Sequence, residues 1–104
     1  QNIQYLAKDI LINLMEPFIG KKGVGTYVYR GQDSLLDQFI ASSGLLDDKG
    51  LKIEDNAVSI LDLPKYRQQR GKYQHYPFRF WAGEKLLGGY SDHLAISVEI
   101  NLIQ

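Results

Sequence analysis

The sequence has no cysteine, and its 104 residues include only three prolines, one methionine and one tryptophan. Without cysteine the chain can form neither a disulfide framework nor a thiolate metal site, and its redox compartment stays undetermined. Basic and acidic residues balance at 12 each. The formal net charge is therefore zero and does not indicate the charge of a partner. Charged residues break the apolar runs well before the roughly 20 residues that cross a bilayer, so no membrane span is predicted.

What the chain has is an ordinary globular composition, 44% apolar and 23% charged, in one domain or part of one. Apolar positions in residues 5–18 recur near every 3.6 residues, which predicts an amphipathic helix that stops at Pro17. Residues 26–30 and 35–41 predict a hairpin, and residues 57–61 and 94–100 predict two further strands. These elements predict an α+β fold, with a mostly antiparallel sheet and one helical layer.

The last predicted strand follows two glycines and the sequence Ser91-Asp92-His93. The glycines permit a tight turn. The acid and the imidazole therefore lie at the start of a strand, where a sheet holds them rigidly while solvent can reach them. This is a suitable place for chemistry on an anion. Taken alone, however, an Asp-His dipeptide is more often a turn acid beside a half-exposed histidine than a catalytic unit.

Asp37 is the second acid of interest, because it shares a face of its predicted strand with Phe39. An ionised carboxylate among apolar side chains needs a partner. One interpretation is that Asp37 lies near a strand end and bonds backbone amides or water. The other is that it faces His93 from a neighbouring strand and stabilises the protonated imidazole.

Residues 64–83 are rich in cations and aromatic rings and contain no acid. Such a mixture suits a groove that follows a nucleic-acid backbone, since cations meet phosphates while rings stack on bases. The plainer interpretation is that the rings are core and the cations are a solvated rim. Arg79 is the cation that we expect to face phosphate, because a guanidinium grips two oxygens at once.

The sequence Gly-Gly-Tyr-Ser-Asp-His-Leu at residues 88–94 resembles the C-terminal signature of the endonuclease/exonuclease/phosphatase superfamily. Its members are metal-dependent phosphodiesterases and phosphatases related to pancreatic deoxyribonuclease. Upstream blocks at residues 25–31, 36–42 and 77–81 follow the order that the family requires, so the similarity runs from about residue 12 to residue 100. The resemblance implies that residues 1–104 are the C-terminal half of a four-layer α/β/β/α sandwich.

The function implied by this resemblance is hydrolysis of a phosphodiester with Mg²⁺ or Mn²⁺, with nucleic acid among the candidate substrates. His93, Asp37 and Asp92 would be catalytic, with Asp92 at the edge of the metal site and Tyr27 and Arg79 touching substrate. Whether His93 moves a proton or stabilises charge is open even for the family. The residues do not separate DNA, RNA, phospholipid headgroup and nucleotide substrates.

The chain departs from the family pattern in lacking the main metal-binding glutamate, the Asp-x-Asn element and an early asparagine. These belong to the N-terminal half, so we expect the 104 residues alone to bind metal poorly and to hydrolyse little. An exposed half-sandwich face also predicts self-association. The alternative function is a non-catalytic binding module that uses residues 64–83 to dock a partner.

Overall fold

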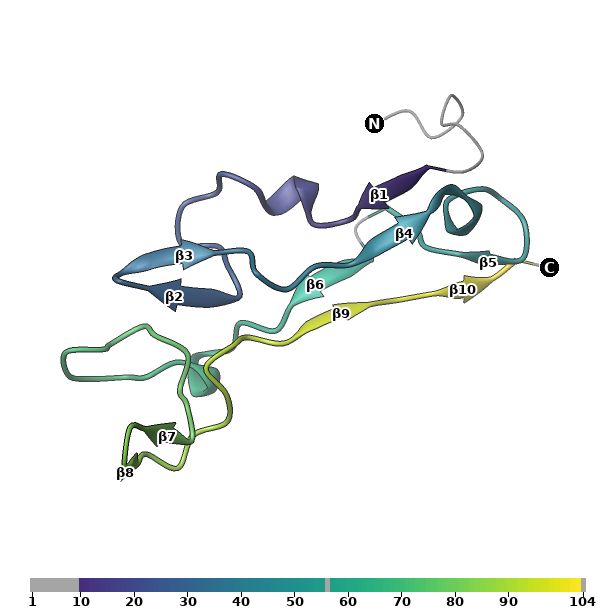
Figure 1. The fold of residues 1–104 in the computed structure, drawn as a ribbon. Coiled ribbons are helices and arrows are strands. Elements are labelled where there is room, and N and C mark those ends of the chain that lie inside the picture. Colours follow the sequence, from purple (N-terminus) through teal and green to yellow (C-terminus); the bar gives the residue numbers. More distant parts are fainter. Residues whose placement is uncertain (1–9, 56, 104) are drawn as a thin grey trace.

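The computed structural model describes residues 10–55 and 57–103 as short antiparallel strand pairs joined by loops (Figure 1). No helix in these residues is long and apolar enough to span a membrane. The strands are β1 (Leu11–Asn13), β2 (Tyr27–Tyr29), β3 (Gln32–Ser34), β4 (Ile40–Ser42), β5 (Leu51–Lys52), β6 (Val58–Ile60), β7 (Trp81–Ala82), β8 (Lys85–Leu86), β9 (Ile96–Val98) and β10 (Asn101–Leu102). Three 3-10 turns, η2 (Glu16–Phe18), η3 (Ser43–Leu45) and η4 (Pro64–Tyr66), complete the described elements.

The predicted α+β fold with a helical layer is wrong. Of the helix predicted over residues 5–18, residues 5–9 lie outside the described part of the chain, and the rest contains β1 and the single turn η2. Strand β1 pairs with β4, which places Ile12 opposite Ala41 in the buried core. Pro17 lies in the first turn of η2, a position that proline tolerates, and η2 is followed by Ile19, where the backbone is extended. Long-range pairing has therefore overridden the apolar pattern with a helical period.

The hairpin predicted from residues 26–30 and 35–41 exists, but with a different second strand. Strand β2 pairs with β3, and Arg30 and Gly31 form the turn with φ values of 49° and 79°. Two positive φ values are what a two-residue type I′ hairpin needs. Residues 32–34, which lie between the two predicted strands, therefore form the second strand of the hairpin and not its turn. The predicted strand at 35–41 is wrong over residues 35–39, which connect β3 to β4, and Asp37 lies in this connection.

The two later strand predictions are confirmed. Strands β6 and β9 pair antiparallel, with Ser59 opposite Ser97, and lie near the middle of the molecule (Figure 1). Strand β9 continues toward β10, which pairs with β5. The chain that carries the Ser-Asp-His sequence therefore enters the central strand pair directly.

The described chain is elongated, with extents of 49 × 26 × 21 Å and a radius of gyration of 16.8 Å. A compact domain of this length has a radius of gyration of about 13 Å. The core is correspondingly small, and its main cluster consists of Ile12, Ala41, Leu46 and Ile53. Several large apolar side chains are exposed, among them Leu11 at 72% and Leu102 at 65%. Self-association stays a prediction, which sedimentation would test.

Candidate active site

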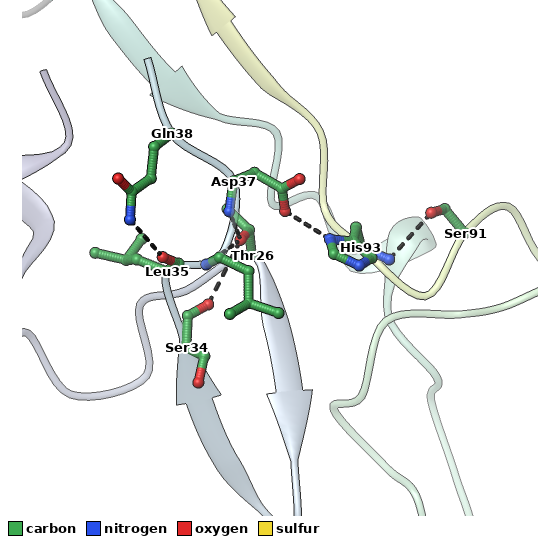
Figure 2. A network of polar contacts seen from close by, with 8 residues as sticks. Thr26, Ser34, Leu35, Asp37, Gln38, Ser91 and His93 are labelled. Atoms are coloured by element: carbon green, nitrogen blue, oxygen red, sulfur yellow. Dashed lines mark hydrogen bonds and ion pairs between the residues drawn. The ribbon is translucent and has the colours of Figure 1, made fainter. Parts of the chain in front are cut away.

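Thr26 joins the three segments that build the site. Its side chain is fully buried, its N–H donates to the Ser34 carbonyl at 2.8 Å, and its own carbonyl accepts from the Leu94 N–H at 2.7 Å. Its hydroxyl oxygen accepts hydrogen bonds from the backbone N–H groups of Leu36 and Asp37, both at 3.2 Å (Figure 2). Thr26 therefore ties the β2–β3 hairpin, the connection to β4 and the entry to β9 at one point.

Gly25 and Gly89 are needed because other backbone comes close to them. A Cβ atom at Gly25 would lie 2.8 Å from the Ser34 backbone nitrogen, and one at Gly89 would lie 2.2 Å from the Phe78 carbonyl oxygen. Both distances are too short for any other residue without a shift of backbone. The second glycine of the Gly-Gly pair thus allows the chain before His93 to pack against residue 78.

The centre of the site is a contact between residues 56 positions apart: Asp37 Oδ2 lies 2.6 Å from His93 Nδ1 (Figure 2). Burial raises the pKa of the Asp37 carboxyl, but hydrogen bonds with His93 and Thr26 and the attraction of the imidazole outweigh it, so the net shift is downward. The two side chains are 37% and 36% exposed, so a ligand can reach them. Because a carboxylate only accepts, Nδ1 carries the hydrogen, and Nε2 is available on the other side of the ring.

Two further groups contact His93, one at its backbone and one at its ring. The Ser91 hydroxyl accepts a hydrogen bond from the His93 backbone N–H at 3.0 Å, and the Tyr27 ring lies 4.9 Å from the imidazole, centroid to centroid, at a tilt of 42°. The structure thus places Tyr27, Asp37 and His93 together. It also gives Thr26 and Ser91 positioning contacts that the sequence analysis missed. No residue-type signal marks Thr26, because its importance comes from burial between segments distant in sequence.

The other two predicted site residues make no hydrogen bond or ion pair with this pair in the described residues. Asp92 is exposed, and within residues 10–55 and 57–103 it makes no hydrogen bond or ion pair. Arg79 lines a separate hollow beside Tyr73 and Tyr76. Their predicted roles, in metal binding and substrate contact, stay predictions.

The described residues contain no group of three His, Asp or Glu side chains that converge as metal ligands do. Asp37 is bonded to His93, and Asp92 lies before β9 without a hydrogen bond or ion pair in the described residues. These residues therefore do not fit a complete site for Mg²⁺ or Mn²⁺, which prefer several oxygen ligands.

Comparison with known proteins gives a family and nothing more specific. No curated protein and no solved structure matches the chain at a significant level. A sequence model described as "Endonuclease/Exonuclease/phosphatase family" matches residues 3–102, which is nearly the whole chain. The chain belongs to the endonuclease/exonuclease/phosphatase family.

Proposed function

We propose that this chain supplies the His93–Asp37 pair to the metal-dependent hydrolysis of a phosphodiester. The observation that carries the proposal is the 2.6 Å contact between the Asp37 carboxylate and His93 Nδ1, on an imidazole that solvent can reach. Membership of a family of phosphoesterases adds the class of reaction. The pair contributes what such a reaction needs besides a metal, namely a group that moves a proton or stabilises charge.

The chemistry assigned to the pair follows from its geometry. In hydrolysis, a bond forms between phosphorus and a water oxygen, and the bond between phosphorus and the leaving oxygen breaks. The neutral imidazole accepts the water proton at Nε2, while the protonated imidazole donates from Nε2 to the leaving oxygen or to a phosphoryl oxygen. Asp37 fixes the tautomer and stabilises the positive charge that forms on the ring. The Tyr27 ring packs beside the imidazole, and Ser91 accepts a hydrogen bond from the His93 backbone.

The requirement for Mg²⁺ or Mn²⁺ is part of the proposal and rests on the family. The described residues do not form a complete metal site, and the proton transfers assigned to His93 do not involve the ion. Chelation should abolish hydrolysis by the full-length protein that contains this chain, and added Mg²⁺ should restore it. We expect little hydrolysis from the 104 residues alone. Their unaided, Mg²⁺-dependent and His93-dependent turnover would contradict this expectation.

The decisive experiment compares wild-type full-length protein with His93→Ala and Asp37→Asn on a chromogenic phosphodiester and on plasmid DNA. The loss of one acid-base or charge-stabilising group lowers kcat by roughly a hundredfold or more. Asp37→Asn should lower kcat less than His93→Ala does, because asparagine keeps the shape of the side chain and removes only its charge. Added imidazole should partly rescue His93→Ala, which a merely structural histidine would not allow.

His75→Asn is the matched control, because it removes the other histidine of the chain. His75 is exposed and has a φ of 75°, a conformation that asparagine tolerates. Its activity should equal that of wild type. Equal activity of wild type and His93→Ala would overturn the proposal.

A further inference from the structure

Residues 66–78 form an arm that is separate from the acid-base pair, at the same end of the molecule as the β7–β8 hairpin (Figure 1). Together with that hairpin, the arm borders a hollow of about 440 Å³ lined by Gln68, Tyr73, Tyr76, Arg79, Ala82, Gly83 and Leu87. Its polar and aromatic groups are therefore one guanidinium, two phenol rings and an amide, beside small and apolar residues. These groups are of the kind that recognise an anion beside a flat aromatic ring.

Contacts along its length hold the arm in place, so the hollow is preformed. Its two sides pair through backbone hydrogen bonds, including Gln68 N–H to the Tyr76 carbonyl at 2.8 Å. At the β2–β3 turn, the Gly31 N–H donates to the Tyr76 hydroxyl at 2.7 Å. At its base, Arg67 donates two hydrogen bonds to the Asp62 carboxylate and a third to the His75 carbonyl.

The charges around the hollow favour a polyanion. Arg67 is neutralised by Asp62, but Lys65, Arg70, Lys72 and Arg79 make no ion pair within residues 10–55 and 57–103. The acids that flank these cations along the chain are Asp62, which is paired with Arg67, and Glu84, which is exposed in the turn between β7 and β8. A half-buried guanidinium without a carboxylate is ready to accept a phosphate.

The aromatic rings add a second kind of contact. Tyr73 is 48% exposed, and Tyr76 meets it edge to face at 5.2 Å, which steadies the ring. Lys72 lies 5.6 Å from the centroid of the same ring. A steadied and exposed ring beside a row of cations is the arrangement on which single-stranded nucleic acids stack.

A larger hollow, of about 700 Å³, lies near β1 and β6 and serves as an internal comparison. Its lining is mostly aliphatic, and its charged members are Glu16, Glu54 and Asp55 against a single lysine, Lys21. An excess of carboxylates repels phosphate. The two hollows therefore differ in charge: the one beside the arm has a guanidinium and no carboxylate in its lining, whereas the other has three carboxylates and one lysine.

We propose that the hollow between the arm and the β7–β8 hairpin binds single-stranded nucleic acid, with a backbone phosphate on Arg79 and a base on the Tyr73 ring. The inference goes beyond the acid-base pair and does not depend on it. A phospholipid headgroup would use Arg79 but has no flat ring for Tyr73. Loss of binding on removal of Tyr73 therefore distinguishes the two ligands.

The test measures binding of a fluorescein-labelled single-stranded DNA of roughly ten nucleotides. It uses full-length protein with His93→Ala in chelator, so that binding is scored without hydrolysis. In that background we expect Arg79→Ala to weaken binding roughly tenfold and to lower the slope of log affinity against log salt by about one. Tyr73→Ala should weaken binding by roughly fivefold or more and leave the salt slope unchanged. Arg79→Lys, which keeps the charge and the fold, should restore the salt slope and part of the affinity.

Arg70→Ala is the matched control, because it removes the same charge from the same arm outside the hollow. Its effect should be clearly smaller than that of Arg79→Ala. Equal losses for the two arginine variants would mean general attraction to a basic surface and would overturn the inference, as would unchanged affinity in folded Tyr73→Ala. Arg79-dependent binding to phosphatidylserine vesicles, with no binding to the oligonucleotide, would also overturn it. If the wild-type protein binds DNA in this pattern but hydrolyses nothing, the proposed function fails and this inference stands.

Discussion

The acid-base pair and the arm lie at the same end of the molecule but are held by different means. The pair depends on the fully buried Thr26, whose hydroxyl oxygen accepts from the Asp37 N–H, and on the hydrogen bond between Asp37 and His93 Nδ1. The arm depends on backbone hydrogen bonds between its two sides, on the Arg67–Asp62 ion pair and on the Tyr76 hydroxyl, and several of its cations have no acidic partner in the described residues. Buried, satisfied contacts fix one geometry, whereas surface contacts leave charge available for a ligand. The first region suits chemistry, and the second suits binding.

The largest expected effect comes from a substitution that damages both regions at once. Gly89→Ala would place a Cβ atom 2.2 Å from the Phe78 carbonyl oxygen, between the base of the arm and the chain that leads to His93. Because backbone must move, we expect the free energy of unfolding to fall by about 3 kcal/mol. Urea denaturation measures it. Gly44→Ala is the control, since its nearest contact would be 3.7 Å away, and similar losses in both variants would contradict the clash.

A substitution that breaks only the first region should have the next largest effect. Thr26→Val keeps the shape but removes the acceptor for the N–H groups of Leu36 and Asp37. Unsatisfied buried donors cost roughly 1–3 kcal/mol, so we expect a loss of about 2 kcal/mol and lower kcat. Thr26→Ser keeps the hydroxyl and should stay much closer to wild type in both measurements. If Val and Ser behave alike, the hydroxyl does not position Asp37.

A substitution confined to the second region should separate the two functions. Arg67→Leu removes the ion pair with Asp62 and the bond to the His75 carbonyl, so the arm should loosen. The expected stability loss is about 1 kcal/mol, because Asp62 is partly exposed and the pair is screened. Limited proteolysis should cut residues 68–75 faster, while hydrolysis of a small phosphodiester is unchanged. The Arg70→Gln variant, which loses an unpaired cation, should be cleaved no faster than wild type. Equal cleavage of all three proteins would contradict an anchoring role for Arg67.

The smallest expected effect is a dependence of stability on pH that comes from Asp37. Its pKa is lower in the folded state than the ordinary value of 3.8, so its charged form stabilises the fold. That contribution is fully present above about pH 3.8 and is lost as the pH falls through the lower folded-state pKa. The stability advantage of wild type over Asp37→Asn should therefore shrink over that acidic range. A constant advantage of wild type over Asp37→Asn across that range would contradict the linkage.

The parts of the fold that the sequence predicted correctly are the ones whose signal is local. Strands β6 and β9 have β-branched residues in an alternating pattern, and the pairing between them agrees with it. The helix over residues 5–18 failed because the core needed Ile12 opposite Ala41, a contact 29 positions away that no local pattern reports. The hairpin turn failed because Arg30, which is not a usual turn residue, adopts a positive φ next to Gly31.

The residues of the candidate site also divide into those that the sequence indicates and those that only the structure reveals. The sequence by itself determined the family and singled out His93 and Asp37, because a short order of residue types carries that information. Only the tertiary structure decided that Thr26 joins their segments, that Ser91 rather than Asp92 bonds the His93 backbone, and that Arg79 belongs to another hollow. The physical reason is that residue type sets the chemistry a side chain can perform, whereas its partners depend on burial and on contacts between distant segments.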